Sequence, residues 1–194
     1  MKIVIIDYGA GNVYSVQSAI RRLGYETVVS TAAAVIRTAD RVIFPGVGQA
    51  SAAMEKIRGN GLDILLPQLE MPVLGICLGM QLMCSYTEEE DTPGLGIFPV
   101  RVKKFSGIEK VPHMGWNTIE GLKTALFEDI AEGERMYFVH SYAVPENEYC
   151  IARCDYGESF SAAVARNNFY GCQFHPEKSG DLGLQILKNF AELS

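Results

Sequence analysis

Residues 72–81 read Pro-Val-Leu-Gly-Ile-Cys-Leu-Gly-Met-Gln, an apolar run that leads into a cysteine. Gly75 and Gly79 lie two residues before and two residues after Cys77. Glycines at these positions leave room for a sharp turn from a strand into a helix, as in the G-x-S-x-G turn that carries the nucleophile of many hydrolases. The start of a helix favours negative charge, and a thiolate is the attacking species in acyl transfer. The stretch therefore predicts a strand, a turn with Cys77 as nucleophile, and a helix.

A second segment, near the other end of the chain, supplies the groups that a cysteine nucleophile needs. Residues 169–177 read Phe-Tyr-Gly-Cys-Gln-Phe-His-Pro-Glu. Pro176 favours an extended backbone at His175, and the i, i+2 spacing then puts the side chains of His175 and Glu177 on one side. A carboxylate in that place can fix the imidazole tautomer and stabilise its charged form. Taken alone, Cys77 could be a buried core residue and His-Pro-Glu a surface turn, but together they indicate a catalytic triad.

The rest of the chain alternates strand-like and helix-like segments. Helical spacing of apolar residues predicts a helix over 13–23, which Gly24 ends, and another is expected over 182–190. Strands joined by helices form a mostly parallel sheet with helices on both faces, so we expect a single α/β domain with a mixed sheet over the 194 residues. Functional loops then lie at the carboxyl ends of the strands, where Cys77 falls. Strands are expected over 2–7, 27–30, 41–44, 73–76, 151–154, 160–165 and 169–174, of which 27–30, 41–44 and 73–76 read as buried.

Segments 75–81 and 175–177 are similar to the nucleophile and base motifs of the class I glutamine amidotransferases, which use a Cys, His and Glu triad. Four further segments resemble, in order, one branch of that family, the glutaminase subunits of imidazole glycerol phosphate synthase. The resemblance covers the whole chain and implies a flavodoxin-like fold and hydrolysis of glutamine to glutamate and ammonia, without a cofactor. The four segments are 7–12 (Asp-Tyr-Gly-Ala-Gly-Asn), 45–48 (Pro-Gly-Val-Gly), 112–117 (Pro-His-Met-Gly-Trp-Asn) and 137–142 (Tyr-Phe-Val-His-Ser-Tyr).

Hydrolysis of an amide creates an oxyanion, which needs preorganised donors such as backbone N–H groups. Leu78, at the start of the predicted helix, is expected to supply one of them. The segment around Val47 and Gly48 is expected to supply the other, because its glycines allow a peptide to turn toward the substrate. The family resemblance assigns this segment to the oxyanion site and implies that its peptide can be misoriented until the partner is activated.

Substrate recognition needs groups for both ends of glutamine. Gln81 lies one helical turn beyond the nucleophile and so points to the same face, and the family resemblance supports a binding role for it. The resemblance also places Gly46 at the substrate and assigns the α-carboxylate to the backbone of Ser141 and Tyr142. His140 is expected to be a structural histidine rather than a second base.

Ammonia in bulk water is mostly the unreactive ammonium ion, so a glutaminase that feeds a synthesis gains from passing ammonia directly to a second active site. The chain shows no candidate second site, and the family places that chemistry on a separate (β/α)8-barrel cyclase subunit, which forms imidazole glycerol phosphate and an aminoimidazole carboxamide ribotide (AICAR). The resemblance thus implies a heterodimer. Residues 112–117 read as a loop that holds the one Trp of the chain. The expected contacts with the barrel are Asn12, Trp116, Tyr137 and Lys178.

Composition argues against several other classes of protein. A net charge of −6 disfavours a nucleic-acid partner. The N-terminal apolar run 3–6 is too short for a signal peptide, and no stretch approaches the roughly 18 apolar residues of a membrane span, so we expect a cytoplasmic protein with no membrane association. Five cysteines without framework spacing read as free thiols.

Three short patterns suggest other features. Cys150 and Cys154 could join a histidine in a zinc site, but only two thiols cluster, so we predict no metal. Residues 9–11 read Gly-Ala-Gly after a strand, like a dinucleotide fingerprint, but Tyr14 occupies the third glycine position and a nucleotide site is rejected. Residues 87–91 are expected to form a solvated acidic loop.

Three alternative functions stay open at this point. A PfpI-like cysteine hydrolase, of the intracellular peptidase type, shares the fold but usually carries His directly after the nucleophile, where this chain has Leu78. A catalytically inactive binding module would be expected to lack one member of the triad, and all three are present. An amidotransferase subunit for another synthase, of the anthranilate or GMP type, is the nearest competitor.

Overall fold

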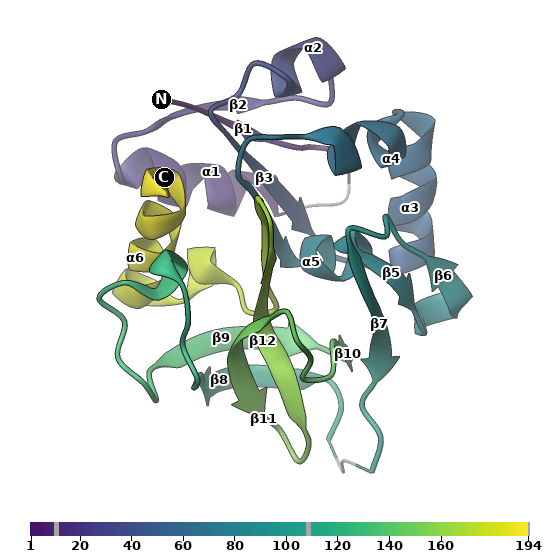
Figure 1. The fold of residues 1–194 in the computed structure, drawn as a ribbon, viewed down its shortest axis with the longest axis vertical. Helices are drawn as coiled ribbons and strands as arrows, with labels where there is room; N and C mark the ends of the chain where they lie inside the picture. The colour runs from purple at the N-terminus through teal and green to yellow at the C-terminus, as the bar shows by residue number, and fades with distance from the viewer. Residues whose placement is uncertain (10–11, 108–109, 194) are drawn as a thin grey trace.

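One mixed sheet runs through the middle of the structure, a computed structural model that describes residues 1–9, 12–107 and 110–193 (Figure 1). Within these residues seven strands pair in the order β11-β12-β13-β4-β3-β1-β2. The strands from β13 to β2 are parallel, whereas the β11–β12 and β12–β13 pairs are antiparallel. The predicted mostly parallel, mixed sheet is therefore confirmed. The strands are β1 (Lys2–Ile5), β2 (Glu26–Val29), β3 (Arg41–Gly46), β4 (Val73–Cys77), β11 (Cys150–Asp155), β12 (Ser159–Arg166) and β13 (Phe169–Cys172).

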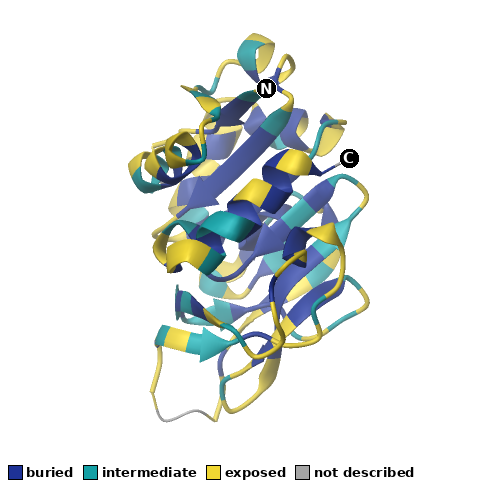
Figure 2. Ribbon diagram, turned by 90° about the vertical axis from the view of Figure 1, so that its left-hand side faces the viewer, coloured by how far each residue is buried: buried dark blue, intermediate teal, exposed yellow. Residues whose placement is uncertain are grey.

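Helices cover both faces of this sheet (Figure 1). Alternate residues of a strand point to opposite faces. Ile3 and Ile5 therefore pack with α1 and α6, whereas Val4 and Ile6 pack with α3, α4 and α5. These four side chains are fully buried, and Figure 2 shows the same burial along the central strands. The helices are α1 (Val13–Arg22), α2 (Ala33–Ile36), α3 (Ala50–Gly59), α4 (Leu62–Leu65), α5 (Leu78–Met83) and α6 (Gly180–Glu192), with 3-10 turns η1 (Leu66–Gln68), η2 (Glu89–Asp91), η3 (Ala125–Phe127) and η4 (Pro176–Lys178).

Smaller sheets complete the described part of the chain. Four strands pair in the order β10-β7-β5-β6, and β8 pairs with β9 in an antiparallel ribbon. The ribbon corrects the prediction of a loop at 112–117, because residues 113–117 belong to β8 and Gly115 is accommodated within the strand. These strands are β5 (Cys84–Thr87), β6 (Thr92–Pro93), β7 (Phe98–Lys104), β8 (His113–Thr118), β9 (Arg135–His140) and β10 (Tyr142–Ala143).

A second correction concerns β2, which was expected to be buried. It lies at the edge of the seven-stranded sheet and pairs only with β1 among the described strands. Val28 is 36% exposed and Val29 is 38% exposed. The apolar composition predicts the strand correctly, but its place in the strand order decides its exposure.

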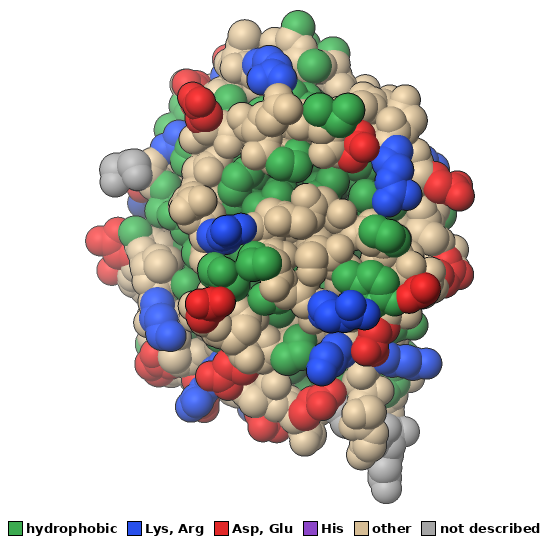
Figure 3. All heavy atoms as spheres, turned by 45° about the vertical axis from the view of Figure 1, so that its right-hand side comes forward, with side chains coloured by type: hydrophobic (Ala, Val, Ile, Leu, Met, Phe, Trp, Pro, Cys, Tyr) green, Lys and Arg blue, Asp and Glu red, His purple; other side chains and the backbone are tan. Residues whose placement is uncertain are grey.

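The surface carries charges of both signs. On the face shown in Figure 3, Lys and Arg side chains lie among Asp and Glu side chains, with hydrophobic side chains between them. In the described residues no helix combines the length and the apolar character that crossing a membrane requires.

Candidate active site

Cys77 lies at the turn between β4 and α5, as the glycine pattern predicts. Its φ and ψ are 53° and −111°, a conformation that residues with side chains rarely adopt and that the surrounding packing must hold in place. A Cβ on Gly79 would lie 1.9 Å from the carbonyl oxygen of Phe44, and one on Gly75 would lie 2.4 Å from Met83 Cε. The two glycines therefore allow α5 to rest directly on the sheet, with Cys77 at the carboxyl end of β4.

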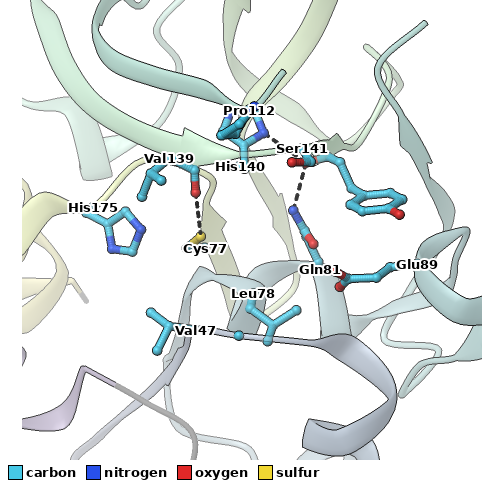
Figure 4. Close-up of a pocket in the computed structure, with 12 residues that line it drawn as sticks. Val47, Cys77, Leu78, Gln81, Glu89, Pro112, Val139, His140, Ser141 and His175 are labelled. Carbon is cyan, nitrogen blue, oxygen red and sulfur yellow. Dashed lines mark hydrogen bonds between the residues drawn. The ribbon is translucent and has the colours of Figure 1, made fainter. Parts of the chain in front are cut away.

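His175 and Glu177 meet through a short turn rather than along an extended strand. His175 itself is extended, with φ −101° and ψ 95°, and η4 then brings Glu177 back toward it. The Nδ1 atom of His175 lies 2.8 Å from Glu177 Oε1, and both side chains are buried. Asn12 Nδ2 donates to the same carboxylate oxygen at 3.2 Å. The other side of the imidazole ring faces Cys77 (Figure 4).

The environment of His175 favours the charged imidazole. Burial by itself lowers the pKa of His175, but the interactions with Cys77 and Glu177 outweigh burial and raise that pKa to about 10. Because the Glu177 carboxylate accepts at Nδ1, that nitrogen carries a proton and Nε2 is the nitrogen on the side of the sulfur. The pair can therefore take a proton from a thiol and deliver it to a leaving group.

A cavity of about 300 Å³ opens beside Cys77 and His175 (Figure 4). It brings together segments that are far apart in the sequence: the end of β3, the start of α5, η2 and the residues that follow β9. The expected oxyanion and substrate residues that line it are Val47, Gly48, Leu78, Gln81, Ser141 and Tyr142.

Gly46, also expected at the substrate, is not among the described residues that line this cavity. It pairs in register with Cys77 across β3 and β4. A Cβ at this position would lie 2.7 Å from the backbone nitrogen of Gly79 and 2.7 Å from the hydroxyl of Tyr8. Gly46 thus allows close packing behind the nucleophile, and Gly48, at φ +95°, turns the chain toward the cavity.

Glu89 lines the cavity, although residues 87–91 were expected to form a solvated loop. Its side chain is half-buried, and its Oε2 accepts a hydrogen bond from the backbone N–H of Ala50 at 3.0 Å. Burial raises the pKa of Glu89, while this hydrogen bond opposes the shift. Nothing in the acidic run distinguishes Glu89 from its neighbours, because its burial depends on the start of α3 lying beside η2. The cavity is also lined by Pro112, Val139 and His140, which sequence reasoning did not place there.

Two buried histidines hold the segment that carries Tyr142. His113 Nδ1 and His140 Nε2 are 3.0 Å apart, and His140 Nδ1 lies 2.8 Å from the carbonyl oxygen of Tyr142. A carbonyl only accepts, so His140 donates from Nδ1 and accepts at Nε2 from His113. Burial lowers the pKa of His113 to about 4 and the pKa of His140 to about 3. Both rings are therefore neutral at pH 7.

We expect this pair to make the protein sensitive to acid. Both folded-state pKa values lie below the unfolded value of about 6.5, so the stability is fully present above that pH and is lost as the pH falls toward the folded values. The free energy of unfolding, measured by urea denaturation at decreasing pH, should fall by up to about 1.4 kcal/mol per pH unit for each histidine. His113→Phe, which preserves a ring stacked on Tyr156, should remove the contribution of one histidine. An unchanged pH slope in that variant would contradict the assignment.

Three of the four expected partner residues lie together at the β8–β9 ribbon and η4. Trp116 is 54% exposed and pairs in register with Tyr137, whose ring centroid is 6.0 Å from its own. Lys178 Nζ lies 6.0 Å from the centroid of the Tyr137 ring. Asn12 instead directs its side chain to Glu177. Two residues of the motif 7–12, residues 10–11, lie outside the described residues. Residue 11 is also the second glycine of the rejected dinucleotide fingerprint.

The remaining cysteines are free and buried, like Cys77. Burial raises the pKa of Cys154 to about 12 and also raises the pKa of Cys150. Cys150 and Cys154 lie on β11, which extends the strand predicted over 151–154 by one residue at each end. Within the described ranges, no group of three or more His, Cys, Asp or Glu side chains could hold a metal ion.

Comparison of the sequence with known proteins points to one family. The sequence model of the family Glutamine amidotransferase class-I matches residues 4–193. The protein named imidazole glycerol phosphate synthase subunit HisH in Bacteroides fragilis (strain ATCC 25285) is 53% identical over the full length of both chains. The protein of the same name in Vibrio parahaemolyticus serotype O3:K6 is 47% identical and covers 99% of this chain and 98% of its own.

Solved structures resemble the fold over nearly the whole chain. A crystal structure of a glutamine amidotransferase matches with a TM-score of 0.75 at 18% identity and covers 96% of this chain and 98% of its own. The structure of PurLQS from Thermotoga maritima matches with a TM-score of 0.70 at 18% identity, over 97% of this chain and 96% of its own. At such identities the matches establish the fold alone.

Proposed function

The chain belongs to the class I glutamine amidotransferases, among the HisH subunits of imidazole glycerol phosphate synthase, and on this basis we propose how its residues carry out the reaction. It is the glutamine amidotransferase subunit of that synthase in histidine biosynthesis. We assign the nucleophile to Cys77, the base to His175 and the orienting carboxylate to Glu177. The observation that supports this assignment is the 2.8 Å contact between His175 Nδ1 and Glu177 Oε1, with Cys77 on the opposite side of the ring (Figure 4).

The proposed reaction has two halves. The charged His175 ring holds, at Nε2, the proton that comes from the Cys77 thiol, and the sulfur attacks the carboxamide carbon of glutamine as a thiolate. His175 then protonates the departing ammonia, and afterwards takes a proton from the water that hydrolyses the glutamyl thioester. Glu177 keeps the imidazole oriented throughout. The raised pKa of His175 fits this sequence, because the charged ring must persist until ammonia leaves.

The oxyanion formed in each half is assigned to two backbone donors. The N–H of Leu78 lies at the start of α5, where no helical carbonyl precedes it to accept its hydrogen bond. The second donor is assigned to the segment of Val47 and Gly48, which lines the same cavity. Donors of this kind act mainly on the transition state, because the charge on the carbonyl oxygen develops there.

The α-amino group of glutamine is assigned to two acceptors on one side of the cavity. Gln81 Nε2 donates to the carbonyl oxygen of Tyr142 at 2.8 Å and to Gln173 Oε1 at 2.9 Å, so the Oε1 atom of Gln81 is left to accept. Glu89 has one carboxylate oxygen bonded to Ala50 and a second that can accept. Two oxygens suit an ammonium group, and the backbone at Ser141 and Tyr142 is assigned to the α-carboxylate.

We expect Glu89→Gln to raise the KM for glutamine with little change in kcat. A hydrogen bond to a charged group contributes roughly 1.5–3 kcal/mol, so KM should rise by about ten- to a hundredfold. Steady-state glutaminase kinetics in the presence of the partner subunit would measure this. The neighbouring Glu88→Gln is a matched control, because Glu88 is exposed and is not among the cavity-lining residues. A Glu89 variant with unchanged KM would remove this residue from the substrate site.

As a subunit of a synthase, the chain works with a partner. We propose that this partner is a (β/α)8-barrel cyclase, that the two chains form a heterodimer in the cytoplasm, and that ammonia passes between them to form imidazole glycerol phosphate and AICAR. Met114 and Trp116 are exposed on one face of β8, opposite Val139 and Tyr137 of β9. Val139 lines the cavity, so this apolar face reaches from the nucleophile to the surface. Aromatic residues and Met are enriched at protein interfaces.

Trp116→Ala should weaken the complex with the barrel by roughly 1–3 kcal/mol while leaving the isolated chain folded, because buried Trp anchors are common interface hot spots. Calorimetric titration would measure the dissociation constant, with circular dichroism as the folding test. Ile64→Ala is a matched control, because Ile64 is 67% exposed on α4, well away from the ribbon (Figure 1). An unchanged dissociation constant for a well-folded Trp116 variant would exclude it from the interface.

A glutaminase assay with and without the cyclase barrel and its ribonucleotide ligand tests the function as a whole. We expect stimulation by the liganded cyclase and none by an anthranilate or GMP synthase domain, since the full-length relatives at 53% and 47% identity are HisH subunits. A PfpI-like hydrolase is disfavoured by Leu78 after the nucleophile. Stimulation by another synthase domain instead would redirect the assignment of the partner.

A further inference from the structure

Gln173 is a buried amide that touches the nucleophile, and the mechanism above gives it no role beyond accepting a hydrogen bond from Gln81. It follows β13 directly and is 0% exposed. Its backbone N–H donates to the carbonyl oxygen of Ala162 at 2.8 Å, which fixes the residue in place. Its side-chain Nε2 donates to Cys77 Sγ at 3.7 Å.

Neighbouring groups determine which end of the Gln173 amide faces the sulfur. The carbonyl oxygen of Tyr142 can only accept, so the group of Gln81 that lies 2.8 Å from it is the NH₂. The same NH₂ lies 2.9 Å from the Gln173 side chain, which must therefore present its oxygen on that side. The nitrogen of Gln173 is left to face Cys77. The orientation of both amides, Gln81 and Gln173, is therefore set by the carbonyl group of Tyr142.

Besides its interaction with His175, the sulfur has two polar contacts that favour different protonation states. The carbonyl oxygen of Val139, 3.8 Å from Cys77 Sγ, can accept a proton from a thiol but offers nothing to a thiolate. Gln173 Nε2 is a donor, and a hydrogen bond donated to the charged form of a group favours that form. When Cys77 passes its proton to His175, the Val139 contact is lost and the Gln173 contact strengthens.

We propose that Gln173 is a catalytic residue, whose amide N–H stabilises the Cys77 thiolate and holds the sulfur toward the substrate carbon. Gln81 has a second role in this arrangement, because its NH₂ orients the Gln173 amide while its oxygen faces the substrate. The inference rests on the proposed function in one respect, that Cys77 is the nucleophile. A purely structural amide would stabilise the fold without changing the reactivity of the sulfur.

The test measures that reactivity directly, without glutamine. Gln173→Met keeps a similar volume and removes the donor, so alkylation of Cys77 by iodoacetamide at neutral pH should slow by roughly tenfold or more. The rate is followed by mass spectrometry of the Cys77 peptide, which separates it from the other four thiols. Gln185→Met is the matched control, because Gln185 makes a comparable 2.8 Å amide bond to Asn189 on α6. The control should alkylate at the parental rate.

Gln173→Glu is the second variant, and it decides the matter if Gln173→Met does not fold. It keeps the shape and the acceptor oxygen for Gln81 but places an acidic oxygen beside the sulfur, so the pH profile of alkylation should move to higher pH. A parental alkylation rate and pH profile in a folded Gln173 variant would overturn the proposal. Failure of the proposed function would look different, because Cys77→Ala would then retain glutaminase activity whatever the Gln173 variants showed.

Discussion

Cys77→Ala should reduce glutamine-dependent synthesis by roughly ten-thousandfold or more, the range seen when a covalent nucleophile is removed. No other described residue that lines the cavity carries a thiol, and the hydroxyl groups of Ser141 and Tyr142 are much weaker nucleophiles than a thiolate at neutral pH. The partner should still use added ammonium salts, since only the supply of ammonia depends on the thiolate. The measurement is the rate of product formation with glutamine and with ammonium chloride.

The control for this substitution is Cys84→Ala. Cys84 is also a fully buried thiol, seven residues further along the chain, and burial raises its pKa well above the ordinary value, so it stays protonated. That variant should retain glutamine-dependent synthesis. Substantial glutamine-dependent turnover by Cys77→Ala would refute the nucleophile assignment.

His175→Asn should be comparably severe, because the same imidazole serves both proton transfers. Glu177→Gln should retain more activity than His175→Asn, since an orienting group assists the base without being it. Single-turnover release of ammonia from glutamine would measure both variants. Equal losses in the two variants would mean that Glu177 does more than orient the ring, and full activity in His175→Asn would exclude it as the base.

His175→Asn should also change how the free energy of unfolding depends on pH. The folded-state pKa of His175 is raised to about 10, above the unfolded value of about 6.5. The stability contributed by the charged ring is therefore fully present below the unfolded value and is lost as the pH rises through the folded value. The parent protein should lose stability over that alkaline range by this route, and His175→Asn should not. The pair of His113 and His140 lowers the stability at acidic pH, whereas His175 affects it at alkaline pH. Measurements of unfolding at acidic and at alkaline pH therefore separate the two contributions.

Local sequence determined the nucleophile turn and the base. Gly75 and Gly79 predict the turn at Cys77 because a Cβ at either position would collide with atoms that any helix resting on this sheet brings close. The His-Pro-Glu segment predicts a pair of adjacent side chains because two residues of separation allow few arrangements. Periodicity predicts α1 and α6 to within a few residues at each end, since burial of one helix face against the sheet requires it.

The family resemblance predicted more residues of the site than the physical patterns did, but it did not predict every contact. Val47, Gly48, Gln81, Ser141 and Tyr142 line the cavity, as the family motifs suggested. Gly46 is not among the described residues that line the cavity, and the register of β3 and β4 places it beside Cys77. The segment that read as a loop at 112–117 is a strand because β9 is available to pair with it.

Tertiary structure alone decided the contacts between distant segments. Asn12 meets Glu177 across 165 positions of sequence, and Gln81 meets Gln173 across 92. Glu89 is the residue of its acidic run that lines the cavity, and the start of α3 holds it there through the hydrogen bond from the backbone N–H of Ala50. Local patterns encode backbone geometry, which depends on neighbouring residues in the chain, whereas these contacts depend on the order of strands in the sheet. The strand order brings the carboxyl ends of β3, β4 and β13 to one edge, and the cavity is formed there.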